Sequence, residues 1–453
     1  PTTMSYYALF GGSELQAWVR KEWDSLIEKI KAARKGKKAK LVIGGPGVWE
    51  YTVLDDEIEK QGIDYLFQGE AEDVVADLFS YISENQEGNQ FTNSYVTYDD
   101  SFHRSAVKHE KFISRGNKYK LYPDIDEIPT IVKPSMDSLT EVMRGCGIGC
   151  DFCEVTLRPL RYYPVEKVID EVKVNVNAGF SNAWLHSDEI FNYRHFQDFV
   201  PNEEALAELF TKVMQVPGVK RSNPTHARIS PAAAYPELIQ KLSDILKAGP
   251  KRWIGTQVGL ETGSERLAKI HMPAKTLPLK IGVDGSWQEF VWKGVYNMNK
   301  YYWRPAFTVQ VGQDGETDED NWDTVALINK ISNSSINGRP FEFTVTPLYN
   351  MPMGRIKAKK INFSDTLSKS ALAVYYASYR HLAKMASRDA RKESKGSLVS
   401  KVGTSSLITF GGYLMLKVVE RIASKAGVDI EKAKTYGIGT EKYIENWSVA
   451  SKL

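Results

Sequence analysis

The sequence has very little cysteine and almost no surplus charge. Only three of its 453 residues are cysteines, which excludes a disulfide framework and fits a reducing compartment. Lys and Arg total 59 and Asp and Glu total 56, so a net charge of +3 gives no electrostatic argument for a dedicated nucleic-acid-binding protein. No apolar run of about 18 residues and no signal peptide are found. We therefore expect a soluble, cytoplasmic protein.

Apolar residues are nevertheless numerous enough to form folded domains. Hydrophobic residues make up 42% and charged residues 25% of the chain, which excludes a wholly disordered protein. At roughly 150 residues per domain, the length predicts two or three domains. The distribution of apolar patterns divides the chain into residues 1–83, 84–135, 136–350 and 351–453.

The first of these segments alternates between helical and extended patterns. Helices are expected at residues 15–33, 57–60 and 71–82, and short strands at 41–43 and 65–67. Such alternation predicts the later half of an open, Rossmann-like α/β domain with a parallel sheet. Residues 84–135 are polar and contain Pro123, Pro129 and Pro134, and they are expected to form a linker with some short strands.

A second alternating series occupies residues 136–350. Its expected strands are 139–143, 183–186, 224–229, 253–260, 306–311 and 341–346, and its expected helices are 164–177, 203–214, 236–246 and 319–331. Six successive units of strand and helix predict a partial (βα)6 barrel that is open on one side. The chemistry of such sheets lies at the carboxyl ends of the strands.

Residues 351–453 lack the alternation and predict a mainly helical segment that shapes the substrate pocket. A helical pattern at 366–394 carries a basic face, which is either solvated or receives an anionic lipid headgroup or an acidic protein surface. The residues of this face are Arg380, Lys384, Arg388 and Arg391. Residues 407–426 are apolar, which is typical of a packed core helix or of a helix that docks on a membrane surface.

All three cysteines lie within eight residues, as Cys146, Cys150 and Cys153. Soft thiolate ligands favour zinc, copper(I) or an iron–sulfur cluster. A structural zinc site normally has four protein ligands, but the sequence has no fourth cysteine and no histidine between His109 and His186. Three thiolates on a four-iron cluster would leave one iron open to a cofactor. A three-cysteine zinc site and three buried structural thiols are the alternatives.

At these residues the chain resembles the radical SAM superfamily, whose CxxxCxxC motif matches residues 146–153. The resemblance continues in the same order through residues 187–191, 226–228, 257–265, 312–320 and 347–352. The sequence has Ser-Asp-Glu at residues 187–189, where the family commonly has Gly-Gly-Glu. The resemblance implies that S-adenosylmethionine (SAM) is contacted by Phe152, Asp188, Glu189, Arg228, Gln257 and Glu261.

The resemblance also implies a reaction. Cys146, Cys150 and Cys153 would hold a [4Fe–4S] cluster whose free iron chelates the amine and the carboxylate of SAM. An electron from a donor such as ferredoxin or flavodoxin would cleave SAM to a 5′-deoxyadenosyl radical, which removes a hydrogen atom from an unactivated carbon. A partly closed barrel supplies the required exclusion of water.

The flanking residues also have purely structural interpretations. Asp188 and Glu189 are favourable at a helix N-terminus, and Arg228 is equally well a structural cation. Glu316 and Thr317 open an expected helix and are suitable capping residues. The sequence leaves these interpretations open.

The first segment resembles the cobalamin-binding domain that precedes the barrel in one subclass of the superfamily. The residues that carry this resemblance are Gly44, Gly45, Pro46, Gly69 and Glu70. Paired glycines allow a backbone to approach a flat group closely. The Asp-x-His-x-x-Gly motif that supplies a histidine to cobalt is absent. The domain therefore either binds cobalamin without that ligand or is a vestige.

Bound cobalamin would imply C-methylation of a peptide, a protein or a small molecule. Radical ring closure or carbon–carbon bond formation on a membrane lipid is one alternative, and a non-catalytic metal-binding protein is another. A methylthiolating enzyme is disfavoured, because the sequence lacks the cysteines of a second cluster. We expect no nucleic-acid partner, and peripheral contact with a membrane is compatible with the C-terminal segment.

Overall fold

The computed structural model describes residues 14–84, 91–98, 104–115, 121–360, 368–393 and 398–438. It separates into two compact units. The N-terminal unit comprises Pro1–Thr130, Met351–Ile356 and Lys360–Asp365. The second unit comprises Ile131–Asn350, Lys357–Lys359 and Thr366–Leu453.

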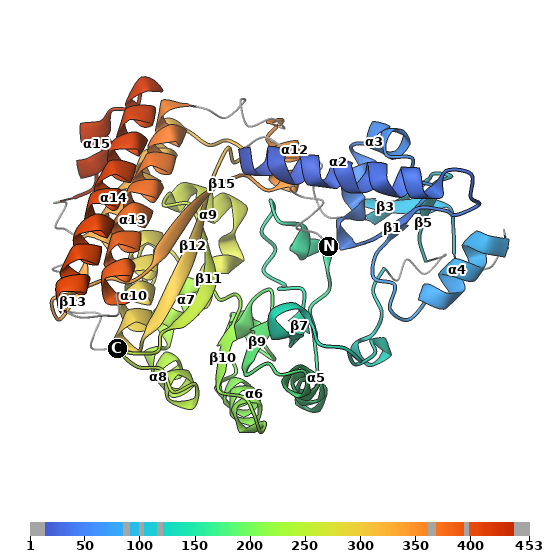
Figure 1. Cartoon of the computed structure of the whole chain (residues 1–453), viewed down its shortest axis with the longest axis horizontal. Coiled ribbons are helices and arrows are strands. Elements are labelled where there is room, and N and C mark those ends of the chain that lie inside the picture. Colours follow the sequence, from blue (N-terminus) through green and yellow to red (C-terminus); the bar gives the residue numbers. More distant parts are fainter. Residues whose placement is uncertain are drawn as a thin grey trace. The chain divides into compact units, whose positions relative to one another are not determined.

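The N-terminal unit is a small parallel sheet with helices on its two faces (Figure 1). Its sheet has the order β1-β2-β5, and both pairings are parallel. The strands are β1 (Val42–Gly45), β2 (Tyr65–Gln68) and β5 (Phe112–Ile113), and the helices are α2 (Glu14–Arg34), the 3-10 helix η1 (Pro46–Thr52), α3 (Asp56–Lys60) and α4 (Val75–Glu84). This arrangement confirms the predicted α/β class of the segment.

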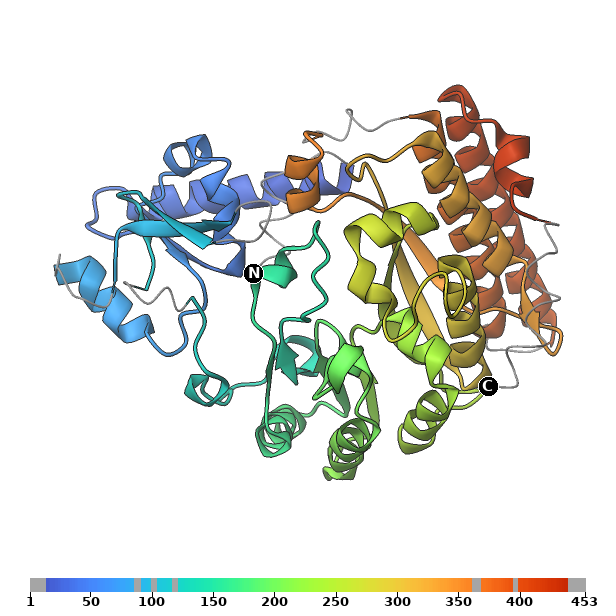
Figure 2. The same ribbon diagram turned by 180° about the vertical axis from the view of Figure 1, so that it is seen from behind.

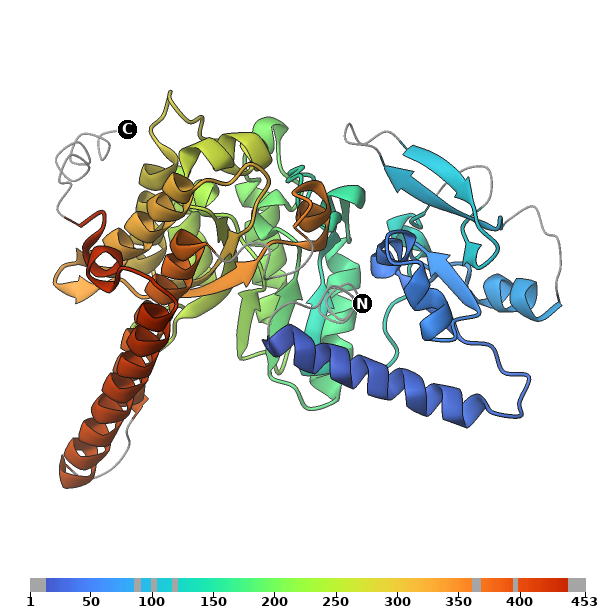
Figure 3. The ribbon, with the colours of Figure 1, turned by 90° about the horizontal axis from the view of Figure 1, so that it is seen from above.

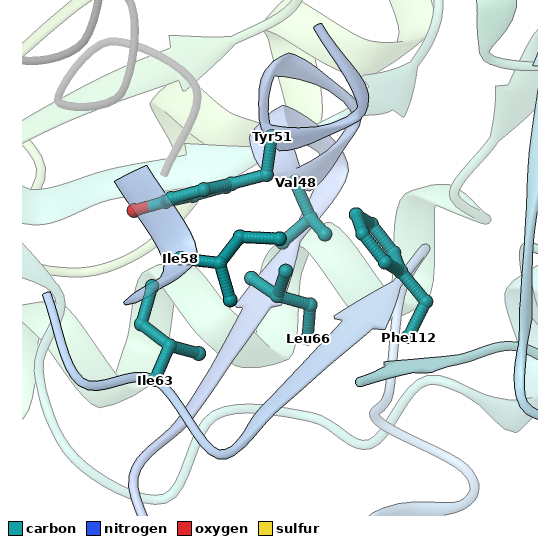
Figure 4. Packing of buried hydrophobic residues seen from close by; sticks show 6 residues of the cluster. All are labelled: Val48, Tyr51, Ile58, Ile63, Leu66 and Phe112. Atoms are coloured by element: carbon teal, nitrogen blue, oxygen red, sulfur yellow. The ribbon is translucent and has the colours of Figure 1, made fainter. Parts of the chain in front are cut away.

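Each face of this sheet has its own apolar cluster. Successive residues of a strand point to opposite faces, so Leu66 and Phe67 of β2 enter different clusters. Figure 4 shows the cluster formed by Val48, Tyr51, Ile58, Ile63, Leu66 and Phe112. The other cluster contains Phe67, Val74, Leu78, Ile82, Phe91 and Ile113. Burial on both faces explains why these short strands read as continuous apolar runs.

Part of the stretch that we expected to be a linker belongs to this sheet. Residues 84–135 contain the antiparallel pair β3 (Ser94–Tyr98) and β4 (Arg104–Lys108), and β5 adds the third strand beside β2. The buried Gln68 side chain accepts a hydrogen bond from Val96 N at 2.6 Å and donates one to Val96 O at 2.8 Å. That side chain fixes β3 against the end of β2.

Six parallel strands form the centre of the second unit. They pair as β6-β9-β10 and β11-β12-β15, and a single parallel bridge between His226 and Gln257 joins the two sets. The strands are β6 (Leu139–Glu141), β9 (Asn182–His186), β10 (Arg221–Pro224), β11 (Ile254–Glu261), β12 (Trp303–Val311) and β15 (Thr344–Tyr349). The strands do not close on themselves, so the predicted partial barrel is confirmed.

Helices cover the outer face of these strands, as Figures 1 and 2 show from opposite sides. They are α5 (Val165–Asn177), α6 (Glu203–Gln215), α7 (Ile229–Ala234), α8 (Pro236–Ile245), α10 (Trp287–Lys300) and α11 (Asp318–Ser332). Leu185, Val258 and Val309 are fully buried between the strands and these helices. The alternate residues of each strand face the interior of the partial barrel.

Two of the predicted strands are misplaced. The third strand is Arg221–Pro224 rather than 224–229, and Ile229 already begins α7. Arg221 and Asn223 are polar residues on the interior face, so the true strand has little apolar signal. The sixth strand is Thr344–Tyr349 rather than 341–346. The chain just before this strand is held by the Asn299 side chain. It accepts a hydrogen bond from Glu342 N at 2.6 Å and donates one to Glu342 O at 2.9 Å.

The C-terminal part is helical, as expected, and consists of α13 (Lys369–Glu393), α14 (Leu398–Lys425) and α15 (Ile430–Thr435). The solvated-face interpretation of α13 is wrong for Arg380, Lys384 and Arg388, which are half-buried. Arg388 donates to Phe341 O at 3.4 Å, and burial lowers the pKa of Lys384. The side chain of Arg391 lies outside the described residues.

Figure 3 shows α14 as one long, straight helix. The core-helix interpretation is wrong for six of its large apolar side chains, which are 46–63% exposed. They are Phe410, Tyr413, Leu414, Met415, Val418 and Ile422. Among the described helices, none combines the length and apolar character that crossing a bilayer requires.

Candidate metal and cofactor site at the carboxyl edge of the barrel

The three cysteines lie in a loop that is closed at its base by a short antiparallel pair. Strands β7 (Met143–Arg144) and β8 (Arg161–Tyr162) pair on either side of it. The loop follows β6, the first strand of the partial barrel, and therefore leaves from the carboxyl edge of the sheet. The 3-10 helix η4 (Glu154–Leu157) begins directly after Cys153. The fold thus places all three thiols where the chemistry of parallel α/β sheets is found.

Glycines give the loop its tight path. Gly145, Gly147 and Gly149 all have positive φ values, of 75°, 73° and 80°. A Cβ atom on Gly145 would lie 2.7 Å from Pro159 O, closer than real Cβ contacts allow. A Cβ atom on Gly149 would meet nothing within 4 Å. Gly145 is thus required by both conformation and space, and Gly149 by conformation alone.

Hydrogen bonds from neighbouring strand ends hold the loop in place. Gly145 N donates to Asp188 Oδ2 at 2.8 Å, and Asn192 Nδ2 donates to Cys146 O at 2.7 Å. Inside the loop, Thr156 Oγ1 donates to Cys150 O at 3.0 Å. The segment after β9 therefore positions the first cysteine, and the second is held from within.

The three thiols share a desolvated environment. All three are free of disulfides, and burial raises the pKa of Cys146 to about 11 and that of Cys150 to about 12. Burial also raises the pKa of Cys153 well above its ordinary value. Among the described residues, no three His, Cys, Asp or Glu side chains are placed to hold a single metal ion. Thiolates at these positions need a positively charged partner, which an iron–sulfur cluster supplies.

A buried ion pair lies directly beside the loop. Arg228 Nε and Glu189 Oε2 are 3.5 Å apart, and both side chains are less than 5% exposed. Arg228 also donates to Leu277 O and to Asn192 Oδ1, at 2.7 Å each. Since Asn192 in turn donates to Cys146 O, Arg228 supports the backbone of the first cysteine. Glu189 accepts from Phe191 N at 3.0 Å, as its interpretation as a helix-terminal carboxylate predicted.

A second buried ion pair faces the other two thiols. Lys275, in the 3-10 helix η7 (Pro273–Thr276), is 2.7 Å from Glu261 Oε1, and Gln310 Nε2 donates to Glu261 Oε2. Burial would lower the pKa of Lys275, but Glu261 and then Cys150 raise it. Lys275 therefore remains a cation beside the cysteine loop. Sequence reasoning missed it, because no local pattern distinguishes it from other lysines.

Several buried polar atoms at this edge have no partner within the described residues. They include Ser187 Oγ, at the end of β9, and both polar atoms of Gln313, after β12. Ser187 is 0% exposed and Gln313 is 2% exposed. Buried polar groups are nearly always hydrogen-bonded, so each of these atoms is a candidate contact for a polar ligand. The amine, carboxylate and hydroxyl groups of SAM match such donors and acceptors.

The residues predicted to contact SAM lie in three places around this edge. Asp188 and Glu189 follow β9 and are tied to the cysteine loop, and Arg228 joins them from the segment after β10. Glu261 ends β11, and its φ of 63° is unusual for a residue other than glycine. Gln257 lies lower on β11, on the exposed interior face.

Phe152, the remaining predicted residue, is 4% exposed inside the cysteine loop. Its neighbour Asp151 is 2.9 Å from His271 Nδ1 and 2.6 Å from Lys357 Nζ. Burial would raise the pKa of Asp151, but the hydrogen bonds from His271 and Lys357 lower it. This charged cluster was missed by sequence reasoning, because its members are 120 and 206 residues apart.

Structural roles are also confirmed for the residues that open α11. Thr317 forms a capping box with Asp320. Glu316 Oε2 accepts from Gly312 N at 2.9 Å and from Gln313 N at 3.1 Å, which closes the turn after β12.

The N-terminal unit has a glycine edge of its own. Gly45 and Gly69 form an isolated bridge at the carboxyl ends of β1 and β2, so the structure brings these two predicted residues together. A Cβ atom on Gly45 would meet nothing within 4 Å, whereas one on Gly69 would lie 2.2 Å from Leu121 O. Open space therefore lies beside Gly45. Residue 69 must be glycine, because the backbone at Leu121 is too close to allow a Cβ atom.

The other residues of this predicted set flank the glycine edge. Gly44 is exposed, and Pro46 opens η1, with its side chain outside the described set. Glu70 is buried, and its backbone accepts from Arg115 Nη2 at 2.9 Å. The open space beside Gly45 is compatible with a flat ligand.

The site is thus a glycine-rich loop with three cysteines at the carboxyl edge of an open barrel of parallel strands. The model of the radical SAM superfamily matches residues 140–328. This part of the chain is a radical SAM domain. The cofactors that such a domain implies are a [4Fe–4S] cluster and SAM, and the donors described above fit both.

The curated relatives are methylthiotransferases. A tRNA-2-methylthio-N(6)-dimethylallyladenosine synthase from Hahella chejuensis is 26% identical over 267 residues, which are 56% of this chain and 53% of that protein. The threonylcarbamoyladenosine tRNA methylthiotransferase MtaB of Chlamydia pneumoniae is 23% identical over 66% of this chain and 61% of its own. The chain spans about half the length of the first curated relatives that it matches.

Among solved structures, the chain is similar to the radical S-adenosylmethionine methyltransferase TsrM from Kitasatospora setae, solved with tryptophan and a SAM analogue. The TM-score is 0.48 and the sequence identity 15%, over 75% of this chain and 61% of that one.

Proposed function

We propose that this chain is a radical SAM enzyme whose cluster is held by Cys146, Cys150 and Cys153. The observation that supports the proposal is the position of three thiols in one loop at the carboxyl edge of the partial barrel, where Ser187 and Gln313 have polar atoms without a partner among the described residues. When bound, the cluster would supply the electron that splits a carbon–sulfur bond of SAM.

The side chains around the loop would orient the cofactors. Arg228 and Asn192 hold the backbone of Cys146, and Asp188 holds Gly145. Lys275 would offset the negative charge of the thiolates. Ser187 and Gln313 would bind polar groups of SAM, with Glu189, Arg228, Gln257 and Glu261 nearby. These contacts would fix the reacting bond and exclude water from it.

The test of this proposal is the formation of 5′-deoxyadenosine from SAM under anaerobic, reducing conditions. Gln313→Leu removes both unpaired polar atoms without touching a cysteine, so it should weaken SAM binding while iron content stays unchanged. A Gln313→Leu protein that cleaves SAM with an unchanged KM would contradict this placement of the cofactor.

For the overall reaction we propose cobalamin-dependent C-methylation of an unactivated carbon in a peptide, a protein or a small molecule. The support is the glycine edge of the N-terminal unit, where Gly44, Gly45, Pro46, Gly69 and Glu70 gather and Gly45 faces open space. Incubation with methyl-deuterated SAM should give labelled product only when cobalamin is added. Replacing Gly45 by Val would fill the open space, so it should prevent cobalamin binding and leave 5′-deoxyadenosine formation intact.

A second candidate is a reaction on RNA. The relative from Hahella chejuensis is named as a tRNA-2-methylthio-N(6)-dimethylallyladenosine synthase, and that from Chlamydia pneumoniae as a threonylcarbamoyladenosine tRNA methylthiotransferase. Transfer of a methylthio group would be hard to reconcile with this sequence, because its three cysteines all belong to one loop. Mass analysis of nucleosides from RNA incubated with the enzyme and labelled SAM would show whether RNA takes up a methyl group. An unlabelled RNA pool beside a labelled peptide would rule this candidate out.

A further inference from the structure

The opposite edge of the partial barrel carries a pocket that the proposed reaction does not use. It is a cavity of about 280 Å³ at the amino ends of β9, β10 and β11. Its walls are Asn182, Ala183, Trp184, Arg221, Ser222, Asn223, Lys251, Arg252, Trp253 and Gly255. The volume is close to the lower limit of roughly 300 Å³ for small-molecule sites.

Hydrogen bonds hold the backbone that frames this pocket. Gly249 and Arg252 exchange two backbone hydrogen bonds, at 2.8 and 2.9 Å, which fixes the turn before β11. Asn223 Nδ2 donates to Gly255 O at 2.9 Å across the junction of β10 and β11. Trp253 packs edge-on against Tyr302, with ring centroids 5.5 Å apart. The pocket is therefore formed before any ligand arrives, which lowers the entropic cost of binding.

Positive charge in the pocket is not compensated by its own walls. The ten lining residues include Arg221, Lys251 and Arg252 and no acidic residue. Partial burial and the charge of Arg221 lower the pKa of Arg252. Two guanidinium groups that repel each other cost stability, and a bound anion between them would remove that cost.

One buried polar group of the pocket also lacks a partner within the described part of the chain. It is Arg252 Nη2. Arg252 uses another nitrogen, Nη1, to donate to Lys220 O at 3.3 Å. The lining thus retains a guanidinium donor that a ligand could satisfy.

We propose that this pocket, formed by Arg221, Lys251 and Arg252 between Trp184 and Trp253, binds the phosphate group of a ligand. Two guanidinium groups and one ammonium offer more donors than a carboxylate can use, and they match the several oxygens of a phosphate. The two indole rings provide apolar walls on which a planar group attached to the phosphate can stack. The site is separate from the cysteine loop and does not depend on the proposed reaction.

The test is the binding of inorganic phosphate to the full-length, cluster-containing protein, by calorimetry and by thermal shift at constant ionic strength. Phosphate should raise the Tm more than chloride does. Arg252→Gln should reduce phosphate affinity by roughly tenfold or more, because a charge-assisted hydrogen bond is lost. Lys300→Gln, which removes an exposed charge on α10 outside the pocket, is the matched control and should leave the affinity unchanged.

A second variant separates binding from folding. Arg221→Gln removes an exposed charge that acts against Arg252, so the variant should be as stable as the wild type or slightly more stable without phosphate. Its Tm should then rise less than that of the wild type when phosphate is added. An equal phosphate-induced rise in wild type, Arg221→Gln and Arg252→Gln, or no rise in any of them, would overturn the proposal.

The source of the phosphate is distinguished by comparing three probes: inorganic phosphate, a nucleoside monophosphate and a short single-stranded RNA. Quenching of tryptophan fluorescence that is lost in Trp184→Leu would show that a base stacks in the pocket, and would assign the site to a nucleotide. Equal affinity for inorganic phosphate and the nucleoside monophosphate would assign it to a free phosphate group. Failure of all three probes to bind would overturn the site and leave the radical chemistry untouched.

Discussion

The two edges of the partial barrel carry charge in opposite ways. At the carboxyl edge, buried acids and bases are paired, as in Glu189 with Arg228 and Glu261 with Lys275. At the amino edge, Arg221 and Arg252 face each other in a pocket without an acidic wall. At the carboxyl edge the buried charges are paired with each other beside the cysteine loop. At the amino edge the positive charges of the pocket are available to a ligand.

Burying charged groups costs free energy at both edges. A buried ion pair repays its desolvation only when its geometry and its extra hydrogen bonds are good. Arg228 donates to Leu277 O and to Asn192 Oδ1 and lies beside the Glu189 carboxylate, although its Nε has no hydrogen-bond partner among the described residues. Arg252 also has one buried nitrogen without such a partner, and the residues that line its pocket include no acid. The first cation therefore has a carboxylate beside it, and the second has none in the lining of its pocket.

At the carboxyl edge, replacing a cysteine should have the largest effect on iron binding and activity. Cys150→Ala should abolish iron binding and 5′-deoxyadenosine formation, because the sequence contains no cysteine that could replace it. Iron and sulfide analysis of the anaerobically reconstituted protein measures the first, and chromatography of the SAM products measures the second. A Cys150→Ala protein that keeps a full cluster would break the comparison, since the loop would then not be a ligand site.

Breaking the buried ion pair should have the next largest effect. Arg228→Gln leaves Glu189 buried without its cation, which should lower the free energy of unfolding by about 3–5 kcal/mol. The double variant Glu189→Gln/Arg228→Gln should recover part of that loss, because no uncompensated charge remains. Urea denaturation of the single and double variants measures both changes. Equal destabilisation in the two would mean that the pair is not energetically coupled.

The glycines of the cysteine loop provide a matched pair of smaller changes. Gly149→Ala places a side chain at φ 80° in open space, and it should cost about 1–2 kcal/mol. Gly145→Ala adds contacts below 3 Å with two carbonyl oxygens, so it should cost more than about 2 kcal/mol and reduce cluster occupancy. Equal stability of the two alanine variants would show that the loop is not held as tightly as the structure indicates.

The amino edge predicts a pH effect on stability. His381 of α13 stacks on Phe343, just before β15, and burial lowers its pKa to about 3, with Arg388, Lys384 and Arg304 adding to the effect. The unfolded chain binds a proton there below about pH 6.5, and the folded chain does not until about pH 3. Stability from this group is therefore complete above pH 6.5 and falls by about 1.4 kcal/mol per unit below it.

Urea denaturation between pH 7 and pH 5 measures this slope. His381→Gln keeps a polar side chain but cannot titrate, so its stability should depend less on pH than that of the wild type. Identical slopes in the two proteins would show that His381 is not held neutral by its burial and by the cations beside it.

The sequence predicted the elements of the barrel better than it predicted the contacts between them. The cysteine loop, α5, β9 and α6 lie where their patterns placed them, because their apolar residues follow the period of a strand or of a helix. Strand β10 was misplaced because Arg221 and Asn223 face the polar interior and interrupt the apolar signal.

The charged contacts around the site could not be predicted from sequence. Asp151 meets His271 across 120 residues, and Lys275 meets Glu261 only because η7 folds back on the end of β11. The basic pocket has the same origin, since Arg221 and Arg252 belong to different strand starts. Each of these contacts depends on how neighbouring strands are placed in the sheet, which no local pattern encodes.

The most direct test of the account is the production of 5′-deoxyadenosine from SAM by the reduced, reconstituted protein, with Cys146→Ala, Cys150→Ala and Cys153→Ala measured beside it. The account predicts turnover that depends on the reductant in the wild type and none in any of the three variants. A wild-type protein that binds zinc in place of iron, or variants that still cleave SAM, would contradict it.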